Sequence, residues 1–477
     1  MAPQIADTET LPTFLDFNII TATDSYKVSH WLQYPKGTQY VRSYLEARLG
    51  ARYSETLFFG LQYFLRRYFA GVQVTQKKID RAARKFSKHL FDPEGKIFNR
   101  EGWEYILKVH GGRLPLRIRA VREGTTVPVN NVLITVENTD PNCAWLVNYV
   151  ETLLVQMWYP ITVATRSKVL KRTILEALMK SGTPEDIMFK LHDFGFRGVS
   201  SRETAAIGGA AHLLNFWGTD TFAGIELLEE FYDGDGVGPL GYPGFSIPAT
   251  EHSNITSWGR DGEADAVGNL LKNHPTGLVA CVADSFDFKY FVQNIVCGVH
   301  KETIATRDGV FVVRPDSGDP HTLIPEALQI LWDAFGGDII KGFKRLDKHV
   351  RIIQGDGIDD VTVGTILKAI MDAGWSADNI AFGSGGGLLQ KMDRDTQRFA
   401  FKCSQIIIDG IERDVYKAPK TDPTKNSKRG HLKLVRENGV WNTVQFDAPG
   451  EDLLVTVFEN GEIIYTTTLA EIRKIIN

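Results

Sequence analysis

Residues 310–320 read VFVVRPDSGDP, an apolar run that ends in Arg314, Pro315 and Asp316. Four other stretches have the same form: MFKLHDFGFRG at 188–198, GLVACVADSFD at 277–287, VRIIQGDGIDD at 350–360 and NIAFGSGGGLLQK at 379–391. Each apolar run has the length of a buried strand, and a helical pattern follows its polar end. Strands that alternate with helices form parallel sheets through right-handed crossovers. We therefore predict an α/β fold in which residues 186–400 form an irregular parallel α/β barrel.

The chain on either side of this segment has a different pattern. Residues 115–138 alternate apolar and polar side chains between Gly and Asn breaks, which predicts antiparallel strands. Near the C-terminus, three dipeptides that tolerate the positive φ of tight turns each separate two strand-like runs, namely Asp409-Gly410, Asn438-Gly439 and Asn460-Gly461. We predict three hairpins there. We therefore predict a second, discontinuous domain rich in antiparallel strands. It consists of an accessory α+β region at 1–185 that is completed by residues 401–477.

The composition is that of an ordinary globular chain. Of its 477 residues, 43% are apolar and 23% are charged, and the net charge is −4. At roughly 150 residues per domain, the length predicts two or three domains. The charge balance provides no basic excess for nucleic acid, so an anionic substrate needs a local cluster of Arg and Lys. The four cysteines form no C-x-x-C pair, which favours a reducing compartment.

Neither a targeting segment nor a membrane span is expected. Residues 1–14 hold no basic segment followed by an apolar run, so they do not indicate a signal peptide. The most apolar long stretch, residues 143–159, is interrupted by Asn148, Glu151 and Gln156. We predict that it forms a core helix rather than a membrane span. The chain is therefore expected to be cytoplasmic and to bind neither nucleic acid nor membrane.

Polar residues at the ends of successive parallel strands are expected to gather in one site, although each could be an ordinary turn residue. The turn FGSGGGLLQK contains Gly385 and Gly386, where backbone without Cβ atoms can approach a phosphate closely. It matches neither the Walker A pattern nor the dinucleotide fingerprint. Arg394 follows closely and could add a bidentate contact to the same phosphate.

Two acidic strand ends extend this site. Arg314 suits a phosphate or diphosphate, and Asp316 suits sugar hydroxyls or a hydrated Mg²⁺. A purely structural ion pair between the two is the alternative. Asp356, held between Gly355 and Gly357, repeats the pattern. Together with the glycine-rich turn, these residues predict a phosphorylated sugar as the substrate.

A flat ring could bind beside the sugar. In LHDFGFRG, Phe194 or Phe196 could stack on a heterocycle while Arg197 meets an anion, unless both rings belong to the core. Asp220 lies among small residues in GTDTFAG and could accept a hydrogen bond from a ring amide. In FSIPATEHSNI, His252 lies in a polar loop, where a lone histidine is most often simply solvated.

Taken together, these stretches resemble the nicotinamide phosphoribosyltransferase family. The resemblance covers nearly the whole chain in order; the principal motifs are NIITATDSYKVSHWLQYP, FFGLQYF, VENTDP, VQMWYPITVAT, KLHDFGFRGVSSRET, GTDT, IPATEHSNITSWG, RPDSGDP, IQGDGID, FGSGGGLLQKMDRD and FKCSQIII. Phe196 and Thr250 depart from the Tyr and Ala of the family pattern, which leaves the details of a substrate tunnel open.

The resemblance implies an activity and a role for each motif. The family forms nicotinamide mononucleotide and diphosphate from nicotinamide and phosphoribosyl diphosphate with Mg²⁺, in NAD salvage. It couples ATP hydrolysis to this reaction through a phosphohistidine, which here is His252. Either Glu251 or Asp284 is expected to hold the other nitrogen of that imidazole. The residues implied to meet the diphosphate are Arg197 and Arg314; those implied to hold the ribose and its phosphate are Asp316, Gly355, Asp356, Gly386 and Arg394.

The resemblance also implies a homodimer with shared active sites. Phe194 would cover one face of the nicotinamide ring, and Tyr26 of a second subunit would cover the other. A nicotinate phosphoribosyltransferase is the nearest alternative, and Asp220 argues against it because its carboxylate would repel that of nicotinate. A non-catalytic binding protein of the same fold would not need His252. A barrel hydrolase or aldolase would need a paired-carboxylate motif or a Schiff-base lysine at a strand end, and we find neither.

Overall fold

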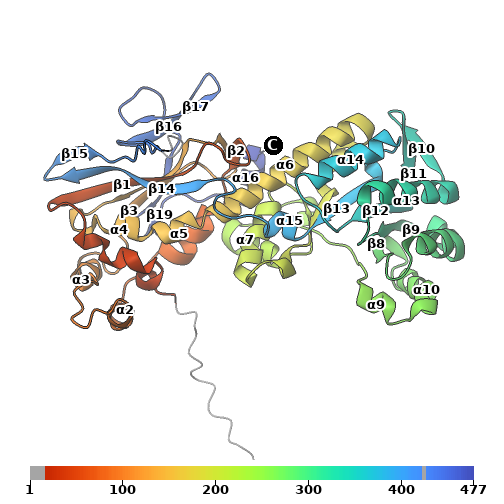
Figure 1. Cartoon of the computed structure of the whole chain (residues 1–477), viewed down its shortest axis with the longest axis horizontal. Coiled ribbons are helices and arrows are strands. Elements are labelled where there is room, and N and C mark those ends of the chain that lie inside the picture. The colour runs from red at the N-terminus through yellow and green to blue at the C-terminus, as the bar shows by residue number, and fades with distance from the viewer. Residues whose placement is uncertain (1–16, 422–425, 477) are drawn as a thin grey trace, which may run out of the picture.

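The computed structural model describes residues 17–421 and 426–476. The segment 1–14, where no signal peptide is expected, lies outside them. Figure 1 shows an antiparallel half on the left and a parallel half on the right, with helix α6 (Trp158–Ser181) running from one toward the other. Buried apolar residues of both halves belong to one continuous hydrophobic cluster. The two halves therefore share a core.

The parallel half confirms the predicted α/β fold. All neighbouring strands in its sheet run parallel, in the order β7-β6-β13-β12-β9-β8. The middle residues of these strands are buried and mostly Val, Ile, Leu and Phe, as expected for a sheet covered on both faces. The strands are β6 (Leu191–Asp193), β7 (Gly218–Thr219), β8 (Thr276–Val282), β9 (Asp308–Arg314), β12 (Val350–Gln354) and β13 (Ile380–Ser384).

An irregular segment, residues 245–250, lies between the edge strands β7 and β8. Phe245 bridges Gly218 on β7, and Ala249 bridges Ala280 on β8. Pro248 accepts a hydrogen bond from Ala280 at 3.0 Å but, as a proline, has no N–H to donate, so no regular ladder forms. The Thr250 hydroxyl accepts from the amide of Val282 at 2.9 Å. The barrel is therefore irregular in the predicted sense, and this segment leads directly to His252.

Helices follow the strands as the crossover rule requires. Among them, α13 packs against β12 and α14. The main ones are α7 (Arg202–His212), α8 (Phe222–Tyr232), α9 (His252–Thr256), α10 (Glu263–Asn273), α11 (Phe288–Tyr290), the π-helix η10 (Phe291–Val299), α12 (Lys301–Thr306), α13 (Pro320–Phe335), α14 (Thr362–Asp372), α15 (Gly386–Leu389) and the 3₁₀ turns η6 (Pro184–Phe189) and η7 (Phe196–Gly198). A hairpin, β10 (Gly337–Ile340) with β11 (Phe343–Leu346), is inserted before β12.

The antiparallel half is built from both ends of the chain. Its main sheet has the order β15-β14-β1-β5-β3-β18-β19. Strand β14 already begins at Phe399, two residues before the predicted boundary at 401; the domain limits stay a prediction. The strands of this sheet are β1 (Thr38–Ala47), β3 (Leu116–Ala120), β5 (Val132–Asn138), β14 (Phe399–Ile408), β15 (Ile411–Asp414), β18 (Val455–Glu459) and β19 (Glu462–Ile463). Two small sheets accompany it: β2 (Glu55–Leu57) pairs with β4 (Thr126–Pro128), and β16 (Leu432–Glu437) pairs with β17 (Val440–Gln445).

All three predicted hairpins are confirmed, as β14–β15, β16–β17 and β18–β19. The first turn residue of each is a non-glycine with positive φ: 49° at Asp409, 50° at Asn438 and 52° at Asn460. Asn and Asp tolerate this conformation, and the Gly that follows each has positive φ as well. The turn dipeptides and their flanking runs were therefore sufficient to predict these three hairpins.

The predicted core helix at 143–159 is wrong in detail. The stretch is broken into the 3₁₀ turn η5 (Pro141–Cys143), α4 (Leu146–Tyr149) and α5 (Glu151–Val155), after which α6 begins. Other helices of this half are α1 (Leu61–Phe64), the π-helix η4 (Leu65–Phe69), α2 (Gln76–His89), α3 (Arg100–Val109), α16 (Leu469–Ile476) and the 3₁₀ helix η3 (Ser25–Leu32). Within the described residues, no helix combines the length and apolarity that crossing a membrane requires.

Candidate active site

The carboxyl ends of five parallel strands meet at one edge of the barrel. Since β8, β9, β12, β13 and β6 are neighbours in this sheet, the residues that follow them are brought together. The polar strand ends selected from sequence therefore lie at the same edge, which is where α/β proteins place their sites.

His252 is held by two carboxylates at this edge. It is the first residue of α9, its Nε2 lies 3.0 Å from Asp284 Oδ1, and its Nδ1 lies 3.9 Å from Asp316 Oδ2. The Asp284 side chain is 6% exposed and also accepts a hydrogen bond from Ser317, whereas the imidazole is 46% exposed. Asp284 is thus fixed in place beneath an accessible imidazole.

Glu251 does not contact that imidazole. Its amide donates to Asn254 Oδ1 at 3.2 Å, and its carboxylate accepts from the Ser253 hydroxyl. Both contacts lie within the first turn of α9, so Glu251 serves the start of that helix. Of the two carboxylates left open by the sequence, Asp284 is the one beside His252.

Arg314 joins the sugar-binding candidates to the ring-binding ones. Its Nη2 donates to Asp316 Oδ1 at 2.8 Å, and its Cζ lies 5.6 Å from the centre of the Phe194 ring. A Cβ at Gly355 would lie 3.2 Å from Arg314 Nε, so glycine leaves room for the guanidinium. Arg314 Nε is buried and has no hydrogen-bond partner among the described residues. Arg314 therefore forms the ion pair with Asp316 that the structural alternative requires. Its guanidinium still has an N–H group that could donate to a ligand.

Phe194 is fixed by the backbone around it. Its amide donates to Ser384 O at 3.0 Å, and its ring occupies the place where any Cβ at Gly383 would be. The ring packs on a small apolar cluster of Ala280, Val312 and Ile353 inside the barrel. Below it, a cavity of about 460 Å³ continues between His192, Ile247, Val310 and Ala381, among others. Phe196, the alternative ring, is 39% exposed on η7.

Asp220 lies on the neighbouring strand end, at β7. Its amide donates to the Asp193 carbonyl at 2.8 Å, and its carboxylate accepts from the Ser246 hydroxyl. Asp193 is fully buried, and its carboxylate accepts from the Gly195 amide at 2.7 Å. Burial raises the pKa of Asp193 to about 7, so near neutral pH this carboxyl is partly protonated and repels a neighbouring anion less than a fully ionised carboxylate would. The sequence indicated Asp193 only as one of the polar residues at a strand end, and it gave no sign of Ser246.

The glycine-rich turn packs between two other loops. A Cβ at Gly387 would overlap the Ile358 carbonyl, which also accepts from Ser384 Oγ at 2.7 Å. On the other side, a Cβ at Gly198 would come within 3.8 Å of the Gly386 amide. The turn therefore lies beside the Asp356 loop and the η7 turn that carries Arg197.

Two predicted residues are less closely engaged. Arg394 is exposed and lies 3.7 Å from Asp395. Tyr26 is 63% exposed on η3, in the antiparallel half, whereas β8, β9 and β12 lie at the far end of the molecule (Figure 1). Within one chain the structure does not bring Tyr26 to Phe194.

The residues suited to Mg²⁺ are Asp316 and Asp356, since this ion prefers carboxylate and water oxygens. Elsewhere in the described chain, His110, Asp140 and Cys143 form a cluster with ligand-like spacing. It mixes nitrogen, sulfur and oxygen, which does not suit Mg²⁺. Its Asp140 already accepts hydrogen bonds from His110 at 2.8 Å and Tyr105 at 3.0 Å, so we assign it a structural role.

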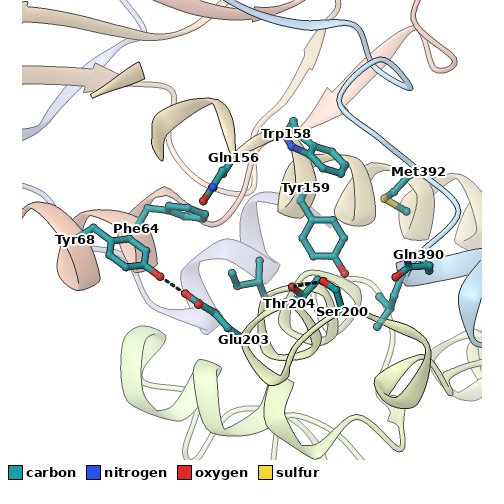
Figure 2. Close-up of a pocket in the computed structure, with 12 residues that line it drawn as sticks. Phe64, Tyr68, Gln156, Trp158, Tyr159, Ser200, Glu203, Thr204, Gln390 and Met392 are labelled. Carbon is teal, nitrogen blue, oxygen red and sulfur yellow. Dashed lines mark hydrogen bonds between the residues drawn. The ribbon is translucent and has the colours of Figure 1, made fainter. Parts of the chain in front are cut away.

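A second cavity of about 430 Å³ lies where the antiparallel half meets α7 and α15 (Figure 2). Glu203 lies on its wall, and its carboxylate accepts hydrogen bonds from the hydroxyls of Tyr63, at 2.6 Å, and Tyr68. Tyr159 and Met392 close it toward the glycine-rich turn. This cavity contains none of the residues selected from sequence.

Comparison with known proteins supports the resemblance seen in the motifs. Residues 189–462 match the model of the nicotinate phosphoribosyltransferase family, and residues 18–118 match the nicotinamide phosphoribosyltransferase N-terminal domain. The chain is 46% identical to the nicotinamide phosphoribosyltransferase of Xanthomonas campestris pv. campestris, covering 96% of this chain and 98% of that protein. It is 32% identical to the enzyme of that name from Acinetobacter baylyi, covering 96% of each.

Solved structures share the fold at low identity. A nicotinate-nucleotide pyrophosphorylase from Pyrococcus furiosus aligns with a TM-score of 0.60 at 16% identity, over 97% of both chains. The human nicotinic acid phosphoribosyltransferase aligns with a TM-score of 0.56 at 15% identity, over 95% of this chain and 92% of that one. The combined sequence matches, over nearly the full length, show that this chain is a pentosyltransferase that belongs to the nicotinate phosphoribosyltransferase family.

Proposed function

We propose that this chain forms nicotinamide mononucleotide and diphosphate from nicotinamide and phosphoribosyl diphosphate, in NAD biosynthesis. The observation that carries the proposal is the carboxylate of Asp220 at the same strand edge as Phe194 and Arg314. The names of the two relatives described above support it. The sparse cysteines, all of them free, fit a cytoplasmic site for the reaction.

The chemistry needs charge stabilisation rather than a strong base. The ring nitrogen of nicotinamide carries no proton; it attacks C1 of the ribose while the bond from C1 to the diphosphate breaks. Negative charge builds up on the leaving group, where Arg314 and Arg197 can neutralise it. Asp316 or Asp356 would hold Mg²⁺, which would supply further positive charge for the leaving group when bound. Asp316 also keeps Arg314 in position through its 2.8 Å contact.

The base is selected by hydrogen bonding at Asp220. A carboxylate accepts from the NH₂ of nicotinamide, whereas it repels the carboxylate of nicotinate. Ser246 donates a hydrogen bond to Asp220 and so keeps its carboxylate oriented. The direct test is to incubate the chain with phosphoribosyl diphosphate, Mg²⁺ and either base, with and without ATP, and to identify the nucleotide formed. Formation of nicotinate mononucleotide at a comparable rate would refute the choice of base.

We expect Asp220→Asn to shift this preference. Loss of a charge-assisted hydrogen bond costs about 1.5–3 kcal/mol, so kcat/KM for nicotinamide should fall on the order of ten- to a hundredfold. Nicotinate should improve in relative terms because the repulsion is gone and the new NH₂ can donate. The measurement is the ratio of kcat/KM for the two bases. If this ratio is the same in both proteins, Asp220 does not read the amide.

ATP coupling is assigned to His252. With Nε2 directed to Asp284, Nδ1 is the nitrogen that can attack the γ-phosphorus of ATP as ADP leaves. The carboxylate of Asp284 accepts a hydrogen bond from the Nε2–H group and stabilises the positive charge that the imidazole gains. The exposure of the ring leaves space for the phosphoryl group.

We expect His252→Ala to keep a basal transferase activity and to lose its stimulation by ATP. Acid-labile label from γ-labelled ATP should appear on the wild-type chain and not on the variant. His321→Ala is a matched control, because His321 also contacts a carboxylate, Asp319, at 2.9 Å. Label that persists on the His252 variant would remove the assignment.

A homodimer completes the site. Tyr26 is exposed and lies in the other half of the chain from Phe194, so only the Tyr26 of a second copy could cover the face of the base opposite Phe194.

A further inference from the structure

Arg166, on α6, is a buried arginine at the back of the candidate sugar-phosphate site. It is 2% exposed and one of the largest fully buried side chains described. Burying a guanidinium is costly unless its donors are satisfied and its charge is compensated. In the part of the chain that the structure describes, Arg166 makes no ion pair with a carboxylate. Its burial therefore calls for an explanation beyond packing.

The guanidinium of Arg166 holds the glycine-rich turn from behind. Nη1 donates to the carbonyl of Gly387, and Nη2 donates to the carbonyl of Lys391 at 3.1 Å. The amide of Lys391 returns to the Gly386 carbonyl at 2.7 Å. One rigid, planar group thus joins both ends of the turn Gly386–Lys391 and fixes its geometry.

The third donor of Arg166 reaches the neighbouring loop. Nε donates to the Tyr53 hydroxyl at 3.0 Å, and that hydroxyl donates to Asp360 Oδ2 at 2.7 Å. Arg52 binds the same carboxylate with two hydrogen bonds of 2.9 Å. Asp360 ends the loop that begins with Gly355 and Asp356. The chain Arg166–Tyr53–Asp360 therefore ties the two loops together.

We infer that Arg166 is a positioning residue that presets the glycine-rich turn and the Asp356 loop for a phosphorylated ribose. It acts through the turn rather than on the ligand, since each of its three nitrogens donates to the protein, to Tyr53, Gly387 and Lys391. The nearby positive charge also favours an anion on the other side of the turn. The inference rests on the proposed function for the identity of the ligand.

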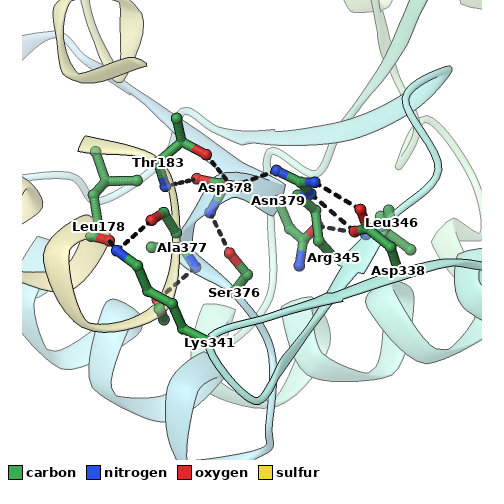
Figure 3. A network of polar contacts seen from close by, with 12 residues as sticks. Leu178, Thr183, Asp338, Lys341, Arg345, Leu346, Ser376, Ala377, Asp378 and Asn379 are labelled. Carbon is green, nitrogen blue, oxygen red and sulfur yellow. Dashed lines mark hydrogen bonds and ion pairs between the residues drawn. The ribbon is translucent and has the colours of Figure 1, made fainter. Parts of the chain in front are cut away.

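The test compares Arg166→Met with Lys341→Met. Lys341 is also a cation bound to backbone carbonyls, those of Met179 at 2.9 Å and Gly182 at 2.8 Å, but it lies at the C-terminal end of α6, away from the site (Figure 3). Both variants should lose thermal stability. Arg166→Met alone should raise KM for phosphoribosyl diphosphate about ten- to a hundredfold. Its KM for nicotinamide should change by less than about twofold, because Phe194 and Asp220 are held by other contacts.

Tyr53→Phe gives a milder second variant, should Arg166→Met not fold. It removes one hydroxyl and should raise KM for phosphoribosyl diphosphate about threefold. The inference is overturned if the folded variant has the same ratio of KM for phosphoribosyl diphosphate to KM for nicotinamide as the wild type. A rise of both KM values by the same factor is such a result. If the wild-type chain makes no nucleotide, the proposed function fails. Calorimetric titration with ribose 5-phosphate then decides: weaker binding by the variant supports the inference, and equal or no binding by both overturns it.

Discussion

Replacing Arg314 by Met is expected to reduce kcat/KM on the order of 10²–10³-fold, the cost of removing one preorganised donor to a developing anion. The side chain sits between Phe194, at 5.6 Å from the ring centre, and Asp316, at 2.8 Å. Methionine fills similar space, so the apolar packing on Phe194 is largely kept while the charge and the donors are lost. The loss should appear mostly in kcat, because the charge on the diphosphate grows as the bond to C1 breaks.

Steady-state kinetics of nucleotide formation measure this effect, and Arg345→Met is the matched control. Arg345 binds two carboxylates, Asp338 and Asp378, in the network of Figure 3, at the opposite end of β12 from the site. Its loss should lower the melting temperature and leave kcat nearly unchanged. If Arg314→Met keeps kcat/KM within about tenfold of the wild type, Arg314 does not stabilise the leaving group.

The elements that could be predicted from sequence are those fixed by local chemistry. The hairpins at Asp409, Asn438 and Asn460 needed only the turn dipeptide and its flanking runs. The parallel strands could be recognised because both faces of them are buried and their apolar runs end abruptly in polar residues. Since parallel neighbours end at the same edge, topology alone predicted that Arg314 and Asp316 lie near Asp284 and Asp356, whereas the place of His252 came from the resemblance.

Interactions between distant segments could not be read in this way. The segment around Pro248 has no strand pattern, yet it lies between β7 and β8 because both edges lack a partner. The stretch at 143–159 has helical composition, but it is broken before α6 begins. The choice between Glu251 and Asp284 depended on side-chain directions that spacing does not give.

Buried polar residues were the largest omission. Arg166 lies within a helix, where a charged residue usually faces solvent, so its pattern gave no signal. Asp193 is adjacent to Phe194 and has the sequence pattern of any strand-end residue, although it is fully buried. Such groups are detected only when burial and hydrogen-bond partners are known.

Mixing two inactive variants is expected to restore activity if Tyr26 acts across a dimer interface. Tyr26→Ala removes the ring that would cover the second face of nicotinamide, and Asp316→Ala removes the partner of Arg314, so each homodimer should be nearly inactive. In a mixed dimer, one site combines the intact Tyr26 of one chain with the intact Asp316 of the other. With random exchange, half of the dimers are mixed and half of their sites are intact, so activity should recover to about one quarter of wild type.

The control must show that activity depends on Tyr26 itself, which is 63% exposed in the single chain, and not on any exposed tyrosine. Tyr290→Ala is the matched control, because Tyr290 is 55% exposed on α11 of the parallel half. That variant should be active alone. The variants are mixed after partial denaturation, and differently tagged chains show how many mixed dimers form. If mixed dimers form and the mixture stays inactive, Tyr26 does not reach the partner's site. Because Tyr26 and Phe194 lie in different halves of one chain, a return of activity would require a second copy to supply the missing ring.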